Sequence, residues 1–377
     1  MPQSQPLRIV HCFRSPVGGI FRHVRDLVEA QNAAGHSVGI LCDSLTGGAL
    51  EEKLFEAIRP KLALGLTRIP MRRAITPGDV VTAWRSLREI SKLQPDVLHS
   101  HGAKGGAYAR IIGSLLRVSG SRVARLYCPH GGSIHYDAAS VKGRLFFFLE
   151  RFLERMTDRL IFVSGYERDG YIEKVGKPRC PTSLVYNGLS PEEFEPVTPN
   201  ADAADFLYIG MMRDLKGADL FLAALALLRD RDGISATAHF VGDGPDKPRY
   251  QEDIRRLGLE SQVRVHDAMP ARMAFAMAHR VVVPSRAESM PYIVLEAIAA
   301  QMPILATRVG GIPEILTHDN DRLIEPGNAA ALADAMKASL SNPELAVEAG
   351  DRREKLRGRF SVERMAQDVE TAYRASR

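Results

Sequence analysis

The sequence of 377 residues is poor in cysteine, and its cysteines do not form a recognisable pair. The four cysteines are scattered without a CxxC motif, which argues against both a zinc knuckle and a disulfide framework. No run of about 18 apolar residues occurs, so we predict no membrane-spanning helix. The N-terminus has no basic start followed by a long apolar stretch. We therefore expect no signal peptide, and a cytoplasmic protein with reduced, buried thiols.

Several motifs of other nucleotide-binding and nucleic-acid-binding proteins are also missing. The absence of GxGxxG weakens the interpretation as a nicotinamide-dependent dehydrogenase. The sequence shows no helix-turn-helix, zinc-finger or RNP pattern, so we expect no nucleic-acid partner. What is present is typical of a soluble globular protein, with 45% hydrophobic and 25% charged residues. The length fits two domains of ordinary size.

Apolar runs alternate with helical patterns along the chain. This alternation predicts α/β domains with parallel sheets covered by helices on both faces. The segment 189–205, rich in Pro, Asp and Glu, is a predicted linker, and the alternation restarts after it. We therefore predict two Rossmann-like, doubly wound domains, about 1–190 and 200–358, with ligands bound in the loops that follow the strands. The predicted strands are 7–13, 37–43, 96–101, 122–129, 159–164, 205–211, 237–244, 262–267, 280–285 and 303–308.

Charge is distributed unevenly between the two halves. Residues 1–190 carry an excess of eleven basic residues, whereas the remainder carries an excess of six acidic ones. A basic first half suggests an anionic partner, such as an acidic membrane surface. The segment 142–156 fits a basic amphipathic helix at such a surface, but its apolar side can equally pack inside the domain. Basic residues available for a surface patch are Lys142, Arg144, Arg151 and Arg155 in this segment, and Arg68, Arg72, Arg73, Arg117, Arg122 and Arg125 elsewhere.

The segment 284–316 carries the most informative pattern. A strand end is followed by a loop with Glu288 and by a helix predicted to start near Pro291, with Ser289 as a candidate N-cap. The N-terminus of that helix is a favourable site for a diphosphate. Glu296 lies eight residues after Glu288. One carboxylate can then reach a sugar and the other the ribose hydroxyls; the alternative is two solvated glutamates beside an ordinary helix.

The whole stretch resembles the signature of retaining, family-4 glycosyltransferases of the GT-B fold. Further elements of that family follow in the expected order over nearly the whole chain. They include an Asn-Gly pair at 187–188, a V-G-x-G-P pattern near 240–245, and the first-domain segments 18–38, 95–110 and 128–137. The matched positions in the second half are Gly210, Lys216, Gly217, Pro284, Ser285, Glu288, Glu296, Pro303, Gly310, Gly311, Pro313 and Glu314.

The resemblance implies a defined architecture and reaction. Two Rossmann-like domains would face a cleft that holds a nucleotide-sugar donor. Domain 1–190 would bind the acceptor, domain 200–358 would bind the donor, and a C-terminal helix at 359–377 would pack back on the first domain. It also implies retention of anomeric configuration and no organic cofactor. The first half is similar to enzymes that assemble bacterial surface polysaccharides, which implies a polysaccharide or lipid-linked acceptor at the cytoplasmic membrane.

The resemblance also assigns roles to single residues. Arg213 and Lys216 would hold the donor diphosphate, although Met211 stands where an arginine commonly follows the glycine; the alternative is a pair of surface charges. His130 would donate hydrogen bonds to the transferred sugar, with a purely structural histidine as the alternative. Further donor contacts are expected from Gly18 and Gly19, which could also form a simple turn, and from Ser289, Met290 and Pro291.

We predict no metal. His99 and His101 have the spacing of a metal pair, but no acidic or cysteine partner lies at a convincing distance, so a loop role is expected. The DxD triplets 230–232 and 319–321 are expected to be solvated turns. Two other functions stay open, namely an epimerase-like enzyme acting on nucleotide-sugars and a non-catalytic, membrane-bound scaffold. The presence of Glu288, Lys216 and His130 argues against the scaffold.

Overall fold

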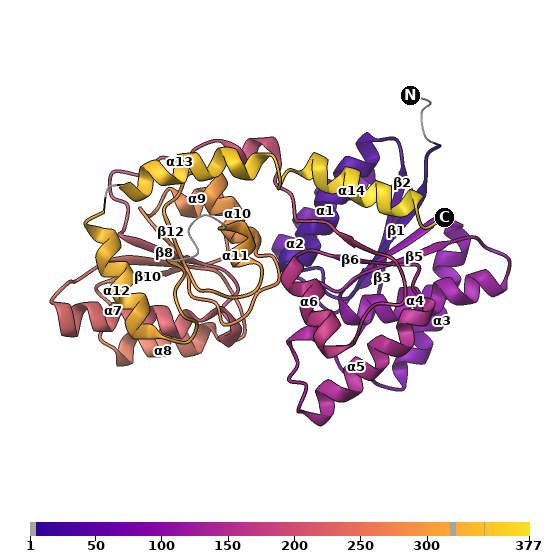
Figure 1. The fold of residues 1–377 in the computed structure, drawn as a ribbon, viewed down its shortest axis with the longest axis horizontal. Coiled ribbons are helices and arrows are strands. Elements are labelled where there is room, and N and C mark those ends of the chain that lie inside the picture. The colour runs from indigo at the N-terminus through magenta and orange to yellow at the C-terminus, as the bar shows by residue number, and fades with distance from the viewer. Residues whose placement is uncertain (1–4, 317–321, 343) are drawn as a thin grey trace. The chain divides into compact units, whose positions relative to one another are not determined.

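The structure is a computed structural model that describes residues 5–316, 322–342 and 344–377. The chain divides into two compact units. The first consists of the residues up to Gly188 together with Val362–Arg377, and the second of Leu189–Ser361. Each unit contains one parallel sheet with helices on its faces (Figure 1), so the predicted fold class is confirmed. Among the described residues, no helix has both the length and the apolar character needed to cross a bilayer.

The first unit is built on a seven-stranded parallel sheet with the strand order β3-β2-β1-β4-β5-β6-β7. The direction of strand progression reverses between β1 and β4. Such a reversal opens a crevice at the carboxyl ends of the two strands, where ligands of open α/β sheets bind. The strands are β1 (Arg8–Phe13), β2 (Ser37–Asp43), β3 (Gly65–Ile69), β4 (Val97–His101), β5 (Ala124–Cys128), β6 (Arg159–Phe162) and β7 (Thr182–Leu184).

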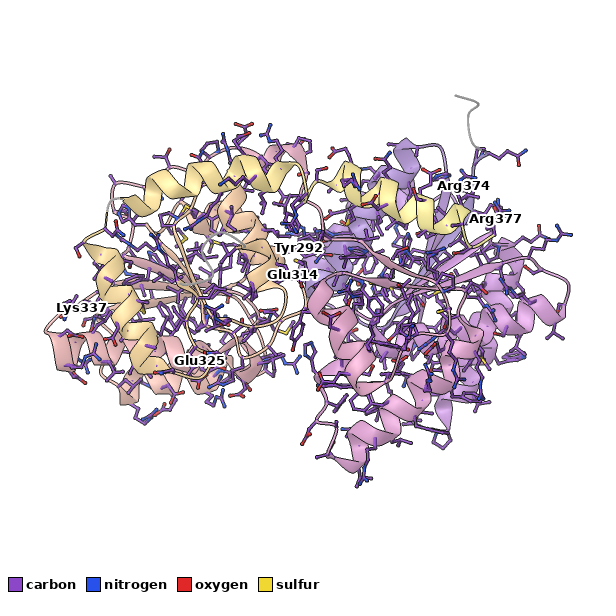
Figure 2. All side chains as sticks on the ribbon, viewed as in Figure 1. Tyr292, Glu314, Glu325, Lys337, Arg374 and Arg377 are labelled. Atoms are coloured by element: carbon purple, nitrogen blue, oxygen red, sulfur yellow. The ribbon has the colours of Figure 1, made fainter. Side chains whose placement is uncertain are left out.

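Helices cover both faces of this sheet. α1 and α14 pack together on one face, while α4 packs between α3 and α5 on the other (Figure 1). Arg374 and Arg377 mark the C-terminal end of α14 (Figure 2), which belongs to the first unit although it follows the second in sequence. The helices are α1 (Gly18–Ala33), α2 (Ala49–Ile58), α3 (Gly78–Leu93), α4 (Gly102–Val118), α5 (Val141–Leu153), α6 (Gly165–Lys174) and α14 (Val362–Arg374).

The second unit is built on a five-stranded parallel sheet with the order β10-β9-β8-β11-β12, and its reversal lies between β8 and β11. Its strands are β8 (Phe206–Ile209), β9 (Ala238–Val241), β10 (Val263–His266), β11 (Val281–Val283) and β12 (Ile304–Ala306). Its helices are α7 (Ala218–Asp232), α8 (Lys247–Arg256), α9 (Ala271–Phe275), α10 (Tyr292–Ala299), α11 (Ile312–Ile315), α12 (Ala329–Leu340) and α13 (Glu344–Arg357).

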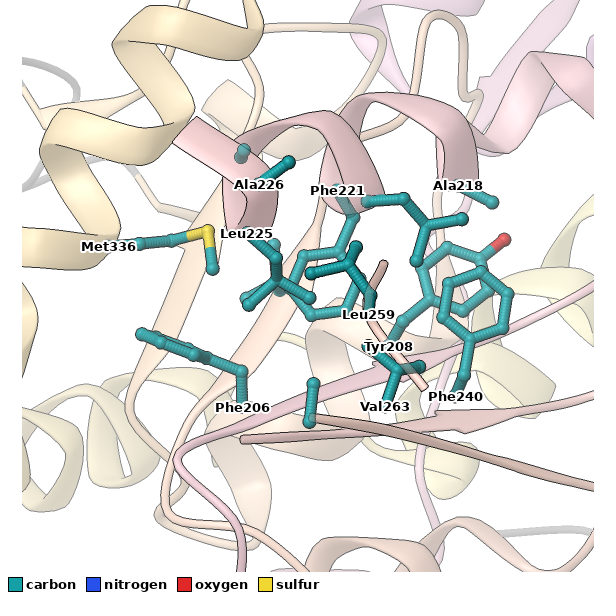
Figure 3. Close-up of a cluster of buried hydrophobic side chains, with 14 of the residues drawn as sticks. Phe206, Tyr208, Ala218, Phe221, Leu225, Ala226, Phe240, Leu259, Val263 and Met336 are labelled. Carbon is teal, nitrogen blue, oxygen red and sulfur yellow. The ribbon is translucent and has the colours of Figure 1, made fainter. Parts of the chain in front are cut away.

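An aromatic core holds the loop that follows β8. Tyr208 stacks on Phe240 with ring centroids 4.4 Å apart and on Phe221 of α7 at 6.4 Å (Figure 3). The Tyr208 hydroxyl reaches the edge of this core and donates a hydrogen bond to the carbonyl oxygen of Met211 at 3.1 Å. The start of the loop is therefore fixed by buried side chains.

Candidate active site

The loops after β8 and β11 meet at the reversal point of the second sheet. There the Lys216 ammonium lies 2.6 Å from Glu288 Oε1 and 2.8 Å from Oε2. The Ser285 hydroxyl donates a second hydrogen bond to Glu288 Oε1 at 2.8 Å. Two residues predicted from separate motifs thus form one ion pair, with a buried carboxylate and a partly exposed ammonium.

Further contacts fix the positions of the loops after β8 and β11. The Arg286 guanidinium forms an ion pair with Asp219 in the first turn of α7, with nitrogen–oxygen distances of 2.8 and 2.6 Å. The Thr307 hydroxyl donates to the carbonyl oxygen of Ser285 at 2.6 Å. These contacts leave the Lys216–Glu288 pair little freedom to move, which favours a preorganised site.

At two positions of the motifs a glycine is required, because the backbone of another loop comes close to it. Gly217 and Gly310 both have positive φ angles, +67° and +58°. A Cβ on Gly217 would lie 1.9 Å from the carbonyl oxygen of Pro284, and a Cβ on Gly310 would lie 1.9 Å from that of Glu288. Only glycine fits at either position without moving the loop that carries the carboxylate.

We expect Gly310→Ala to lower both stability and transfer activity. The left-handed backbone alone costs an alanine about 1–2 kcal/mol, and the contact with the Glu288 backbone adds to this cost. Gly233→Ala is the matched control, because Gly233 has φ +68° but nothing within 4 Å of the added Cβ. Urea unfolding and transfer assays of both variants would check this. An equal loss in the two variants would mean that the Glu288 contact is irrelevant.

Arg213 stands immediately before the single 3-10 turn that contains Lys216. Its side chain is partly buried and forms no hydrogen bond or ion pair with any described residue. An unpaired cation just ahead of the N-terminus of α7 is unfavourable without an anion. Arg213 is therefore more available than Lys216 to bind a diphosphate, because Lys216 already faces a carboxylate.

The start of α10 differs in detail from the prediction. The helix begins at Tyr292 with Pro291 as its N-cap, and no side chain caps it, so the prediction of Ser289 as the N-cap is wrong. The Ser289 hydroxyl is buried and finds no hydrogen-bond partner within the described residues. Met290 and Pro291 are buried, and Glu296 lies partly buried in the second turn.

Tyr292 of α10 and Glu314 of α11 lie on neighbouring elements of the second unit (Figure 2). The backbone amide of Gly311 donates to the carbonyl oxygen of Ser289 at 2.7 Å. The predicted donor residues of this unit, apart from Arg213 and Lys216, thus gather around one helix start and its preceding loop.

The predicted first-unit residues lie in the loops and helix start that follow β1 and β5. Gly18 opens α1 with φ +62°, and Gly19 follows it, both exposed. His130 follows β5 in a left-handed conformation at φ 50°, which is uncommon for a residue with a side chain. Burial lowers the pKa of His130 well below its ordinary value, so the ring is neutral at neutral pH.

His99 and His101 lie on β4, within the predicted strand 96–101, so the loop role expected for them is wrong. Both are fully buried on β4, beside His11 of β1. His11, which sequence spacing did not single out, lies 88 residues away from His99 and faces it through strand register. The only indication of His11 in the sequence was that a polar residue stands inside an apolar strand.

The first DxD triplet is a charged helix end. Asp232 closes α7 and pairs with Arg231 and Lys337, both at 2.7 Å, and Asp230 pairs with Arg229. Both carboxylates therefore already have cationic partners. The second triplet, 319–321, lies outside the described residues.

Family models match both halves of the chain. A family model described as Glycosyltransferase Family 4 matches residues 17–193, and one described as Glycosyl transferases group 1 matches residues 203–342. A D-inositol 3-phosphate glycosyltransferase of Geodermatophilus obscurus is 30% identical over 320 residues, covering 77% of this chain and 69% of that protein.

Two solved structures share the fold over nearly the whole chain. The Anabaena protein HepE, in complex with UDP and glucose, superposes with a TM-score of 0.79 at 17% identity, covering 97% of this chain and 99% of its own. WaaG, a glycosyltransferase involved in lipopolysaccharide biosynthesis, superposes with a TM-score of 0.73 at 15% identity. The match covers 97% of this chain and 99% of WaaG.

Proposed function

The chain belongs to the family 4 (group 1) glycosyltransferases of GT-B fold, a retaining family, and we propose that it transfers a sugar from a nucleotide-diphosphate sugar to a polysaccharide or lipid-linked acceptor of the cell surface. The observation that carries the proposal is the Lys216–Glu288 pair at the reversal point of the second sheet. The UDP bound to HepE supports the donor class, and the role of WaaG in lipopolysaccharide synthesis supports the acceptor class.

The residues suggest how the reaction proceeds. The nucleotide diphosphate leaves an oxocarbenium-like carbon, and the acceptor attacks from the same face. Arg213 and Lys216, together with the N-termini of α7 and α10, stabilise the negative charge that develops on the leaving group. Glu288 faces the sugar, and Glu296 binds the ribose hydroxyls.

A panel of nucleotide-sugars tests the proposal. We expect one nucleotide-diphosphate sugar to raise the melting temperature, because a ligand that binds only the folded state stabilises it. Incubation of that donor with an acceptor glycan should then give an elongated product. An isomerised donor sugar formed without acceptor would instead indicate the epimerase-like enzyme, and no stabilisation by any donor would indicate the scaffold.

We expect Lys216→Ala to weaken binding of the nucleotide diphosphate by roughly tenfold or more, and to weaken nucleoside binding much less. A hydrogen bond to a charged group contributes about 1.5–3 kcal/mol, and the ammonium meets phosphates rather than the base. Calorimetric titration with the nucleotide diphosphate and with the nucleoside would measure both losses. Equal losses would contradict the assignment of Lys216 to the phosphates.

We expect transfer activity to persist in excess EDTA. The second unit offers cations and helix N-termini for the diphosphate, and its described part brings no three metal-ligating side chains together. The measurement is the initial transfer rate with and without chelator. Loss of activity that Mg²⁺ or Mn²⁺ restores would show that the donor needs a metal.

We also propose that the first unit docks on an anionic membrane through α3, α4 and α5. These neighbouring helices expose large apolar side chains, among them Trp84 of α3, Leu115 of α4 and Phe148 of α5. Exposed basic residues accompany them, namely Arg85, Arg88, Lys142, Arg144 and Arg155. The segment 142–156 thus fits both the membrane-surface helix and the helix packed inside the domain in part. Phe147 and Leu153 are buried in the domain, while Phe148 is exposed.

Four basic residues suggested for this patch are already paired. Arg117 and Arg125 both bind Asp158, Arg68 binds Glu52, and Arg151 binds Glu154. These four arginines therefore contribute less to an anionic docking surface than the exposed residues on α3 and α5.

A further inference from the structure

A continuous row of hydrogen bonds, buried except at its partly buried His130 end, connects His130 to the C-terminal helix of the first unit. It runs between the sheet and the helices α1 and α14. The bonded atoms are His130 Nε2 and His101 Nδ1 (3.0 Å), His101 Nε2 and His11 Nδ1 (3.0 Å), His11 Nε2 and Gln31 Oε1 (2.9 Å), Gln31 Nε2 and the Tyr373 hydroxyl (3.1 Å), and the Tyr373 hydroxyl and His99 Nδ1 (2.8 Å).

Strand geometry explains why these side chains meet. His11 of β1 pairs in register with His99 of β4, and His101 lies two residues further along β4, so all three point to one face of the sheet. Their neighbours Val10, Cys12 and Leu98 belong to a separate hydrophobic cluster together with residues of α3 and α4.

The far end of the row is held by the last helix. Gln31 comes from α1 and Tyr373 from α14. Arg377, just beyond α14, donates to Asp96 at 2.7 Å and fixes that end of the helix to the first sheet (Figure 2).

Burial keeps the rings of this row neutral. It lowers the pKa of His11 to about 4 and the pKa values of His99, His101 and His130 well below the ordinary range. A neutral imidazole carries one proton, so each ring that forms two hydrogen bonds within the row donates one and accepts one. The direction of one bond therefore determines the direction of the next.

Gln31 sets that direction. In the orientation that the structure gives this amide, the carbonyl oxygen faces His11 and can only accept, so His11 carries its proton on Nε2 and accepts at Nδ1. His101 must then donate from Nε2, and His130 must donate from Nε2 to His101 Nδ1. The Nδ1 of His130, which has no hydrogen-bond partner among the described residues, is left as an acceptor.

We propose that Gln31 and Tyr373 are positioning residues that hold His130 as the Nε2–H tautomer, so that its Nδ1 accepts a hydrogen bond from a hydroxyl of the transferred sugar. This rests on the proposed function and on the contact between His130 and the transferred sugar that the family resemblance implies. It reverses the donor role that the family resemblance implied. Tyr373 contributes the hydroxyl oxygen that accepts from the Gln31 amide nitrogen while the Gln31 oxygen faces His11.

The same histidines do not form a good zinc site. Two groups of three histidines each offer nitrogens within 4.8 Å of one another, namely His11 with His99 and His101, and His23 with His101 and His130. However, each group contains two nitrogens that are 3.0 Å apart, which fits a hydrogen bond; these are His11 Nδ1 with His101 Nε2, and His101 Nδ1 with His130 Nε2. Two tetrahedral zinc ligands at about 2.0–2.1 Å from the metal would lie roughly 3.4 Å apart. A proton between the two rings therefore explains their spacing better than an ion does.

Nitrogen-15 NMR of the ligand-free, histidine-labelled protein tests the proposal, since the shifts distinguish the two neutral tautomers. We expect His130 to carry its proton on Nε2 in the native chain. Gln31→Leu and Tyr373→Phe should each raise the fraction protonated on Nδ1. They should also lower kcat by roughly 2- to 12-fold, the equivalent of one net hydrogen bond. Tyr171→Phe is the matched control, because Tyr171 is buried in the same unit and bonds Glu154 outside the row.

Native His130 protonated on Nδ1 would overturn the proposal, as would a tautomer unchanged by both variants or one zinc ion per chain in the purified protein. Because the NMR readout needs no substrate, it separates the two proposals. The expected tautomer pattern in a protein that transfers no sugar would refute the proposed function and leave the row intact. If Gln31→Leu does not fold, Tyr373→Phe alone decides the role of the row.

Discussion

Glu288→Gln is expected to lower the transfer rate by a factor of about 100 or more while the protein stays folded. A positioned carboxylate commonly contributes about that much to a reaction. The amide keeps the size of the side chain and can still accept the hydrogen bond from Ser285. It loses the negative charge that faces both Lys216 and the sugar. The turnover rate should therefore fall, while the protein stays folded.

The measurement is kcat with the donor identified by the panel, together with the melting temperature and the affinity for the nucleotide diphosphate. Glu260→Gln is the matched control, because Glu260 is an exposed carboxylate of the same unit with no site contact. Nucleotide affinity should hold or rise, since Lys216 is freed for the phosphates. Near-normal turnover in Glu288→Gln would remove this residue from the catalytic site.

Strands in the middle of each sheet were predictable because they are buried on both faces. β1 and β2 appear in the sequence as continuous apolar runs and were placed within one residue of their observed bounds. The edge strands β3 and β7 were missed. Their residues are largely exposed or only partly buried, so no apolar pattern marks them, and only pairing with β2 and β6 makes them strands.

The residues of the candidate site were predictable, but their contacts were not. Motifs identified Lys216 and Glu288 separately, yet they are 72 residues apart in the sequence, and only the order of β8 and β11 in the sheet brings them together. The row of hydrogen bonds behind His130 could not be predicted from the sequence either, because only strand register brings His11 next to His99. The capping prediction failed because Ser289 stands three residues before the helix, where its hydroxyl is buried instead.

Docking of the first unit on anionic membranes should depend on exposed apolar side chains of α3 and α5. Trp84 is 58% exposed and Phe148 is 68% exposed. Full burial of such a side chain contributes about 1.5–3 kcal/mol, and about 60% of each remains to be buried, so we expect Trp84→Ser combined with Phe148→Ser to weaken vesicle binding by roughly 25-fold or more. Met273→Ser is the matched control, because Met273 is 61% exposed but lies in the second unit.

Vesicle sedimentation measures the binding, and the native chain supplies a second readout. Trp84 is its single tryptophan, so insertion should shift the fluorescence to shorter wavelength. Each basic residue near an anionic surface contributes about 1 kcal/mol, and salt screens that attraction. Binding should therefore require anionic lipid and fall as salt rises. If neutral and anionic vesicles failed equally at low salt, or if the double variant bound like the native chain, α3 and α5 would not form a membrane surface, and a soluble acceptor would be favoured.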